Sequence, residues 1–234
     1  MRRPKEPSVI GFMTIGVTGT SIVSGFSVPD LLIAFALLLI HLFSFDEAFS
    51  SLRAKRFPWK AIAINASPYL ILGVLNKASL LLIPFLIFAS YFLITLKSKS
   101  EELKYVVGSS IPLLPSIAIP LALGKWNWAT WIYWALLTLY AIATAAYVET
   151  KLPWRKMDRR VPLVIWLPSY ALLPLKPLIV IALIEPTIKF LKAIIDGSTI
   201  EPSRLKEFGW REMARSVAFS ILLLVSLTLY IRQP

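Results

Sequence analysis

The residues of this sequence best suited to chemistry are a few polar side chains set within long apolar segments. Glu185 lies near the middle of the apolar segment 177–195, and His41 and Asn65 interrupt two earlier ones. An unpaired charge in hydrocarbon costs roughly 3 kcal/mol, so an ionisable residue there usually faces a cavity or a partner. We therefore expect a cavity or polar site built from residues on several helices: His41, Asn65, Tyr147, Glu149 and Glu185.

Each of these residues also has a purely structural explanation. Glu185 is expected to be protonated, or paired with Lys189 one turn later on the same helical face, if it binds nothing. A lone histidine in a membrane segment, such as His41, is more often packed or hydrogen-bonded than a ligand. Asn65 and Tyr69 form a small polar cluster in the same segment, and a hydrogen bond between helices is the favoured explanation there.

Two charged segments offer a different chemistry, because they combine basic residues with acids at the adjoining ends of apolar segments. Clustered cations of this kind bind an anionic headgroup, a diphosphate or the anionic leaflet of a membrane. The candidate anion-binding residues are Arg53, Lys55, Arg56, Arg155, Lys156, Arg159 and Arg160. If the protein is a transferase, the candidate Mg²⁺ ligands are Asp46, Glu47, Glu149 and Asp158, since hard cations take carboxylate oxygens. The simpler alternative is that these charges only set topology and contact lipid.

The elements that position these residues are set by a composition that does not suit a water-soluble domain. Of the 234 residues, 57% are hydrophobic and only 16% are charged, and the mean hydropathy is +0.70. A soluble protein carries about 25% charged residues. We therefore predict an integral membrane protein that is all-α, since a helix satisfies its own backbone polar groups in lipid.

A membrane crossing needs about 20 apolar residues, and this length criterion predicts nine spans in one integral membrane domain covering 1–234. They lie near 8–28, 29–45, 59–76, 78–96, 105–123, 129–148, 161–175, 177–195 and 214–231. Several prolines around 168–177 leave open whether the seventh and eighth spans are two full crossings or a broken hairpin.

The positions of the basic residues predict the orientation. With nine spans and a cytoplasmic N-terminus, only Lys77, Lys125, Lys176 and Arg232 of the 25 basic residues fall outside. Positive residues are retained on the cytoplasmic side of short loops. We therefore expect a multi-pass protein of the cell membrane with its main charged loops in the cytoplasm, and the net charge of +12 does not indicate nucleic-acid binding.

The first span carries small residues at every fourth position, Gly16, Thr20 and Ser24. Such a strip lets another backbone approach closely. Packing within the helix bundle is the favoured interpretation, and a homo-oligomer interface or a membrane-protein partner is the alternative.

The chain contains no cysteine and one histidine. Iron–sulfur clusters, a structural zinc site and haem held between two histidines are therefore not expected. No cofactor is predicted from the residues themselves.

Short motifs along the chain resemble those of YwiC-like integral membrane proteins. They are the opening Arg3-Pro4-Lys5-Glu6-Pro7, the stretch from His41 through Arg56, the sequence Tyr147-Val148-Glu149-Thr150-Lys151 and the sequence Phe208-Gly209-Trp210-Arg211-Glu212. That family is in turn distantly similar to UbiA-type prenyltransferases. The resemblance implies nine transmembrane helices, a cytoplasmic N-terminus and two cytoplasmic active-site loops after helices two and six.

The catalytic signature of the UbiA enzymes is missing. Their paired Asp motifs hold Mg²⁺ on an isoprenyl diphosphate, whereas this chain has Asp46-Glu47 at the first position and Glu149 with a distant Asp158 at the second. We therefore expect a UbiA-like scaffold that binds a lipid or isoprenoid-type amphiphile without the standard reaction. The alternatives are a divergent prenyl or lipid-diphosphate transferase that uses Mg²⁺ and an accessory subunit of a membrane complex.

Overall fold

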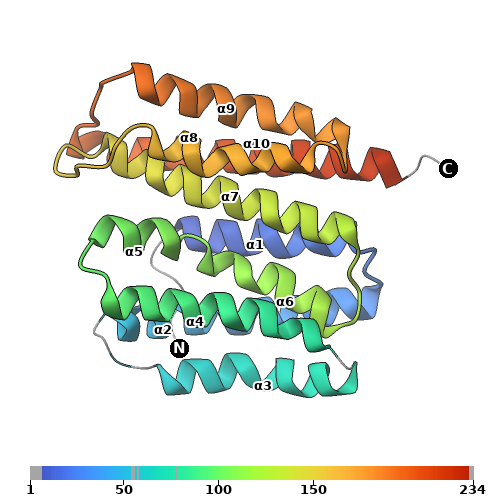
Figure 1. Cartoon of the computed structure of the whole chain (residues 1–234). Coiled ribbons are helices and arrows are strands. Elements are labelled where there is room, and N and C mark those ends of the chain that lie inside the picture. Colours follow the sequence, from blue (N-terminus) through green and yellow to red (C-terminus); the bar gives the residue numbers. More distant parts are fainter. Residues whose placement is uncertain (1–6, 54–55, 57, 77, 232–234) are drawn as a thin grey trace. The chain divides into compact units, whose positions relative to one another are not determined.

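The computed structural model describes residues 7–53, 56, 58–76 and 78–231, and it is helical throughout, with no strand in these ranges. The side chains of a few residues inside these helices, among them Asp46 and Arg53, lie outside the description. The prediction of an all-α protein is confirmed (Figure 1).

The first half of the chain holds the α-helices that correspond to the first five predicted spans. They are α1 (Pro7–Val23), α2 (Val28–Arg53), α3 (Trp59–Leu75), α4 (Leu82–Lys97), α5 (Glu101–Gly108) and α6 (Leu114–Ala122). The 3₁₀ turns η1 (Ser79–Leu81) and η2 (Ile111–Leu113) lead into α4 and α6. Because η2 separates α5 from α6, the fifth predicted span consists of two short helices.

The second half holds α7 (Trp128–Lys151), α8 (Val161–Trp166), α9 (Val180–Ile195) and α10 (Leu205–Ile231). The 3₁₀ segments η3 (Leu167–Leu172), η4 (Pro177–Ile179) and η5 (Pro202–Arg204) adjoin α8, α9 and α10. A turn closed by a hydrogen bond from the Leu175 amide to the Leu172 carbonyl joins the helical segments predicted as spans seven and eight. Helix α10 begins at Leu205, earlier than the predicted start at 214, because the amphipathic stretch before it is also helical.

Five helical segments in the described ranges are long and apolar enough to cross a membrane. They are Val28–Phe45, Ser79–Lys97, Glu101–Ala122, Trp128–Lys151 and Pro202–Leu229. Three shorter apolar helices cover Val9–Val23, Trp59–Leu75 and Val161–Leu172. Large apolar side chains are exposed on these helices, for example Leu32, Val74 and Phe85, as expected where the surrounding solvent is lipid. The membrane character is thus supported, and the count of nine crossings stays a prediction.

Contacts between residues divide the chain into two compact units. Unit 1 contains residues 1–99 and 111–134, and unit 2 contains residues 100–110 and 135–234. The boundary falls within α7, so its first turns belong to unit 1 and the rest to unit 2.

Helix α6 is the centre of unit 1. It contacts α1, α2, α3 and α4, and eight of its nine residues are buried. Figure 1 shows these helices running alongside one another. Small residues on α1 allow the close approach: a methyl group at Gly16 would meet Leu113 at 2.9 Å, and one at Gly19 would overlap the ring of Tyr133. Gly16, a residue of the predicted strip, thus packs within the bundle, in agreement with the favoured interpretation, and Gly19 does so as well.

Aromatic rings form the core of unit 2. Tyr140 of α7 stacks on Phe219 of α10, with ring centroids 4.4 Å apart. Trp166 of α8 meets both Tyr140 and Phe219 edge to face, and it is completely buried. Phe190 of α9 completes the group, 5.9 Å from Trp166. Helices α7 to α10 are therefore held together by ring contacts, each worth about 0.5–1.5 kcal/mol beyond its buried area.

Replacing Gly19 with Ala should lower the free energy of unfolding by roughly 1–3 kcal/mol, because the added methyl overlaps the buried Tyr133 ring. The matched control is Gly209→Ala in α10, where a methyl group meets nothing within 4 Å. This control should leave stability unchanged or raise it by up to about 1 kcal/mol. Thermal unfolding of the full chain in detergent micelles measures both. Equal effects of the two variants would contradict the packing of α1 described above.

Candidate functional site

Unit 1 contains a cavity of about 890 Å³ between α2, α3, α4 and α6. Its wall is almost entirely apolar, and α4 supplies three aromatic rings to it, those of Phe85, Phe88 and Phe92. Ligand pockets in proteins have volumes of about 300–1,000 Å³ and are mostly apolar with a few placed polar groups. The cavity has both properties.

The polar residues of this wall are His41 and Ser44 on α2, Asn65 and Tyr69 on α3, and Ser79 in η1. His41 Nε2 and Tyr69 Oη share a hydrogen bond of 2.6 Å. Asn65 Nδ2 donates to Ser44 Oγ and to the Ala61 carbonyl, both at 2.6 Å. The structure thus brings predicted site residues His41 and Asn65 to one cavity and supplies the hydrogen bond between helices that was the simpler explanation for Asn65.

Asn65 leaves one hydrogen-bonding atom unused. Its Oδ1 is buried and has no hydrogen-bond partner among the described residues. The orientation of the amide is fixed by the Ala61 carbonyl, which only accepts, so that Nδ2 must be the atom that faces it. A buried acceptor without a donor is unfavourable by about 1–3 kcal/mol.

The other predicted residues of the cavity site, Tyr147, Glu149 and Glu185, belong to unit 2 and do not line this cavity. Tyr147 packs between the rings of Phe190 and Phe208, with centroids at 6.3 and 5.9 Å. The polar surroundings of Tyr147 contain the most deeply buried charges of the described chain.

Lys189 of α9 and Glu212 of α10 form a buried ion pair. The distance from Nζ to Oε2 is 3.2 Å, and the two side chains are 3% and 6% exposed. Lys189 Nζ also donates to Tyr140 Oη and Thr144 Oγ1 and lies 4.5 Å from the centre of the Tyr140 ring. The lysine charge is therefore compensated by a carboxylate, two hydroxyls and an aromatic face.

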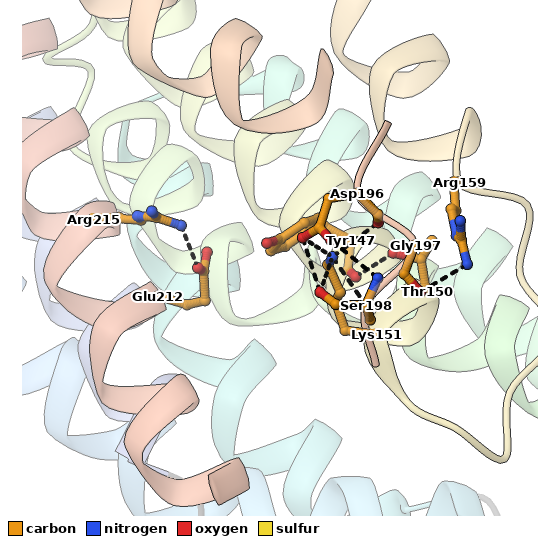
Figure 2. Close-up of polar contacts among 9 residues, drawn as sticks. All are labelled: Tyr147, Thr150, Lys151, Arg159, Asp196, Gly197, Ser198, Glu212 and Arg215. Carbon is orange, nitrogen blue, oxygen red and sulfur yellow. Dashed lines mark hydrogen bonds and ion pairs between the residues drawn. The ribbon is translucent and has the colours of Figure 1, made fainter. Parts of the chain in front are cut away.

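Arg215 extends this pair towards the surface of unit 2. It donates to Glu212 Oε1 at 2.7 Å (Figure 2), and its Nε lies 3.5 Å from Glu185 Oε1. Glu185 is thus paired with Arg215, whereas Lys189, the partner considered from the sequence, pairs with Glu212. Two cations and two anions form a chain that carries no net charge.

Lys151 ties the end of α7 to the segment after α9. Its Nζ lies 2.9 Å from Asp196 Oδ2 and within hydrogen-bond distance of the Asp196 and Ser198 carbonyls and the Ser198 hydroxyl (Figure 2). Arg159 donates to the Gly197 carbonyl in the same segment. The hydrogen bond from Lys151, followed by those from the Ser198 amide and hydroxyl, lowers the pKa of Asp196 to about 2.

Glu149 forms an ion pair with Arg155, whose Nε lies 3.0 Å from Glu149 Oε2 without hydrogen-bond geometry. Glu102 of α5 approaches the same guanidinium at 3.4 Å, and the ring of Tyr105 lies 5.8 Å from Arg155 Cζ. Glu149 is thus engaged by a cation, and Arg155 is shared between two carboxylates.

The remaining predicted residues are exposed or lie outside the described part. Lys156, Asp158 and Arg160 are exposed, and the Asp158 carboxylate accepts a hydrogen bond from the Arg160 amide. Arg56 and Glu47 are exposed too. The side chains of Asp46 and Arg53, and Lys55 as a whole, lie outside the described residues. Among the described residues, no group of three or more His, Asp or Glu is arranged to hold a metal ion.

Sequence reasoning missed Tyr140, Thr144 and Glu212 as partners of a buried charge. The sequence offered one local signal for Glu212: this carboxylate precedes the apolar run of α10 and lies one turn before Ser216. Nothing in the sequence indicates that this carboxylate faces Lys189, because the two residues lie on different helices.

The chain matches no protein-family model, no curated protein and no solved structure. Its resemblance to YwiC-like and UbiA-type proteins therefore stays a prediction.

Replacing Glu212 with Gln should lower the free energy of unfolding by about 3–5 kcal/mol, because it leaves the Lys189 ammonium buried without its counter-charge. The double variant Lys189→Met with Glu212→Leu should recover most of this loss. Glu207→Gln is the matched control on α10: its pair with Arg204 is exposed and should contribute about 0–1 kcal/mol. Denaturant unfolding in micelles measures all three, and a Glu212→Gln effect as small as the control would contradict the buried pair.

The Lys151–Asp196 contact predicts a pH dependence of stability. Since the pKa of Asp196 is lowered from 3.8 to about 2 in the folded protein, the contact stabilises fully above the higher value and is lost as the pH falls towards the lower one. The difference in melting temperature between wild type and Asp196→Asn should be constant from about pH 8 to about pH 5 and shrink below about pH 4. A difference that grows on acidification would contradict the assignment.

Proposed function

We propose that the protein is a multi-pass protein of the cell membrane that binds a lipid or isoprenoid-type amphiphile in the cavity of unit 1. The observation that carries the proposal is the form of that cavity: about 890 Å³, walled by apolar side chains, with polar groups of α2 and α3 on its wall. An amphiphile has the same division between a long apolar part and a small polar part.

The positions of the basic residues support an orientation with the N-terminus and the charged segments around 46–60 and 149–160 in the cytoplasm. The resemblance to a UbiA-like scaffold agrees with this orientation. Ligand entry would then take place from within the bilayer, since the helices that enclose the cavity expose apolar side chains such as Leu70 and Phe85.

A prenyl or lipid-diphosphate transferase is the second candidate, and the observations favour it less. Transfer from a diphosphate needs carboxylates to hold Mg²⁺ beside the leaving group. Glu149 is paired with Arg155, and Asp158 is exposed and accepts a backbone amide. Two basic residues of the second charged segment, Arg155 and Arg159, thus bind the protein's own carboxylates and a carbonyl.

Filling the cavity tests the binding function. Ala66→Trp on α3 places a large ring at the cavity wall, and we expect it to reduce the affinity for a photoreactive isoprenoid probe by about tenfold or more. Ala63→Trp is the matched control, since Ala63 is exposed on the same helix and does not line the cavity. Photolabelling of the purified full chain, followed by mass spectrometry of the labelled peptides, gives the readout. Labelling that is equal in both variants, or located away from α2, α3, α4 and α6, would overturn the proposal.

A further inference from the structure

We infer that the ligand of this cavity has an uncharged head bearing a hydroxyl or carbonyl group, which the His41–Tyr69 pair recognises. The inference rests on the proposed function, and it names the chemical class of the ligand. It separates prenols, sterols and similar neutral amphiphiles from diphosphates and phospholipids, whose heads carry an anionic phosphate.

The wall of the cavity gives the first argument, because none of its described lining residues carries a formal charge. An anion moved out of water into such surroundings loses several kcal/mol of hydration free energy unless a cation compensates it. The buried cation Lys189 in unit 2 illustrates the requirement, because its ammonium has the carboxylate of Glu212 as a partner. The cavity offers an anionic head no comparable partner among its described residues.

The His41–Tyr69 pair gives the second argument. The one hydrogen bond that the His41 side chain makes among the described residues uses Nε2, which leaves Nδ1 for a ligand. A neutral imidazole has one N–H donor and one acceptor nitrogen. If Tyr69 donates to Nε2, then Nδ1 carries the proton and donates to a ligand oxygen. If Nε2 donates instead, then Nδ1 accepts and the Tyr69 hydroxyl hydrogen is free.

Both tautomers therefore present one donor to the cavity, and the second also presents an acceptor. A hydroxyl group can accept from the donor and donate to the acceptor, and a carbonyl can accept from the donor. The donor and acceptor of the His41–Tyr69 pair are thus complementary to a small neutral head, and binding such a head requires no change of charge in the protein.

Asn65 and Ser44 give the third argument. The Ser44 hydroxyl donates to the Ile40 carbonyl at 2.7 Å while it accepts from Asn65, so both of its roles are already filled. Asn65 Oδ1 is buried and has no donor among the described residues. Its partial negative charge disfavours an anionic head beside this wall.

Three farnesyl compounds that differ only at the head test the inference: farnesol, farnesyl diphosphate and the hydrocarbon farnesene. Each is titrated against the photoreactive isoprenoid probe on the purified full chain in neutral detergent. We expect farnesol to bind about threefold to tenfold more tightly than farnesene, the effect of one or two hydrogen bonds. Farnesyl diphosphate should bind less tightly than farnesol.

Variants connect this preference to the named residues. His41→Phe should remove the preference for farnesol over farnesene, and Tyr69→Phe, which deletes only a hydroxyl, should reduce it by about threefold. Binding of farnesene should change less than twofold in both, which shows that the cavity is intact. Ser67→Ala is the matched control, because Ser67 is exposed on α3 and does not line the cavity, and its preference should equal that of wild type.

The outcomes distinguish the two proposals. If none of the three compounds competes with the probe, or if Ala66→Trp leaves all binding unchanged, the proposed function itself fails. If they bind and Ala66→Trp blocks them, but the diphosphate binds as tightly as farnesol, only the inference about the head is overturned. Retention of the full farnesol preference in His41→Phe overturns it as well. Diphosphate binding that is lost in Arg56→Ala would favour the transferase candidate instead.

Discussion

Polar groups surrounded by apolar side chains and lipid must find partners within the protein, and the rest of this structure depends on that constraint. Helices satisfy the backbone, and the side chains follow the same rule. In unit 2, Lys189 and Glu212 are almost fully buried and lie 3.2 Å apart, surrounded by hydroxyls and aromatic rings. The two ions are tolerated there because each neutralises the other, and their helices α9 and α10 are consequently held in one register.

Unit 1 meets the same constraint differently, with neutral groups. The pairs His41–Tyr69 and Asn65–Ser44 each join α2 to α3 by a hydrogen bond of 2.6 Å. Neutral pairs cost less to bury than ions, so these helices can enclose an apolar cavity without a counter-charge in its described wall. Unit 2 thus buries an ion pair between its helices, whereas the described wall of the unit 1 cavity contains only neutral polar groups.

The two charged segments illustrate how far a pattern of charges supports a function. The spacing of Arg155 and Arg159 in the sequence does not distinguish between two roles: binding an external anion and pairing with oxygens of the protein itself. The structure gives Arg155 two carboxylates, Glu149 and Glu102, and Arg159 the Gly197 carbonyl. A cation that already has such partners gains less from an added anion, since the new contact replaces one it has.

From the sequence alone most of the helices can be placed, and their apolar composition predicts lipid as their solvent, because helical hydrogen bonds and hydropathy are local properties. The sequence also identified His41, Asn65 and Glu185 as polar residues that need an explanation. Their partners lie on other helices and are visible only in the folded chain: Tyr69 for His41, Ser44 for Asn65 and Arg215 for Glu185. The cavity is likewise a property of four helices together, and no single segment contains a signal for empty space.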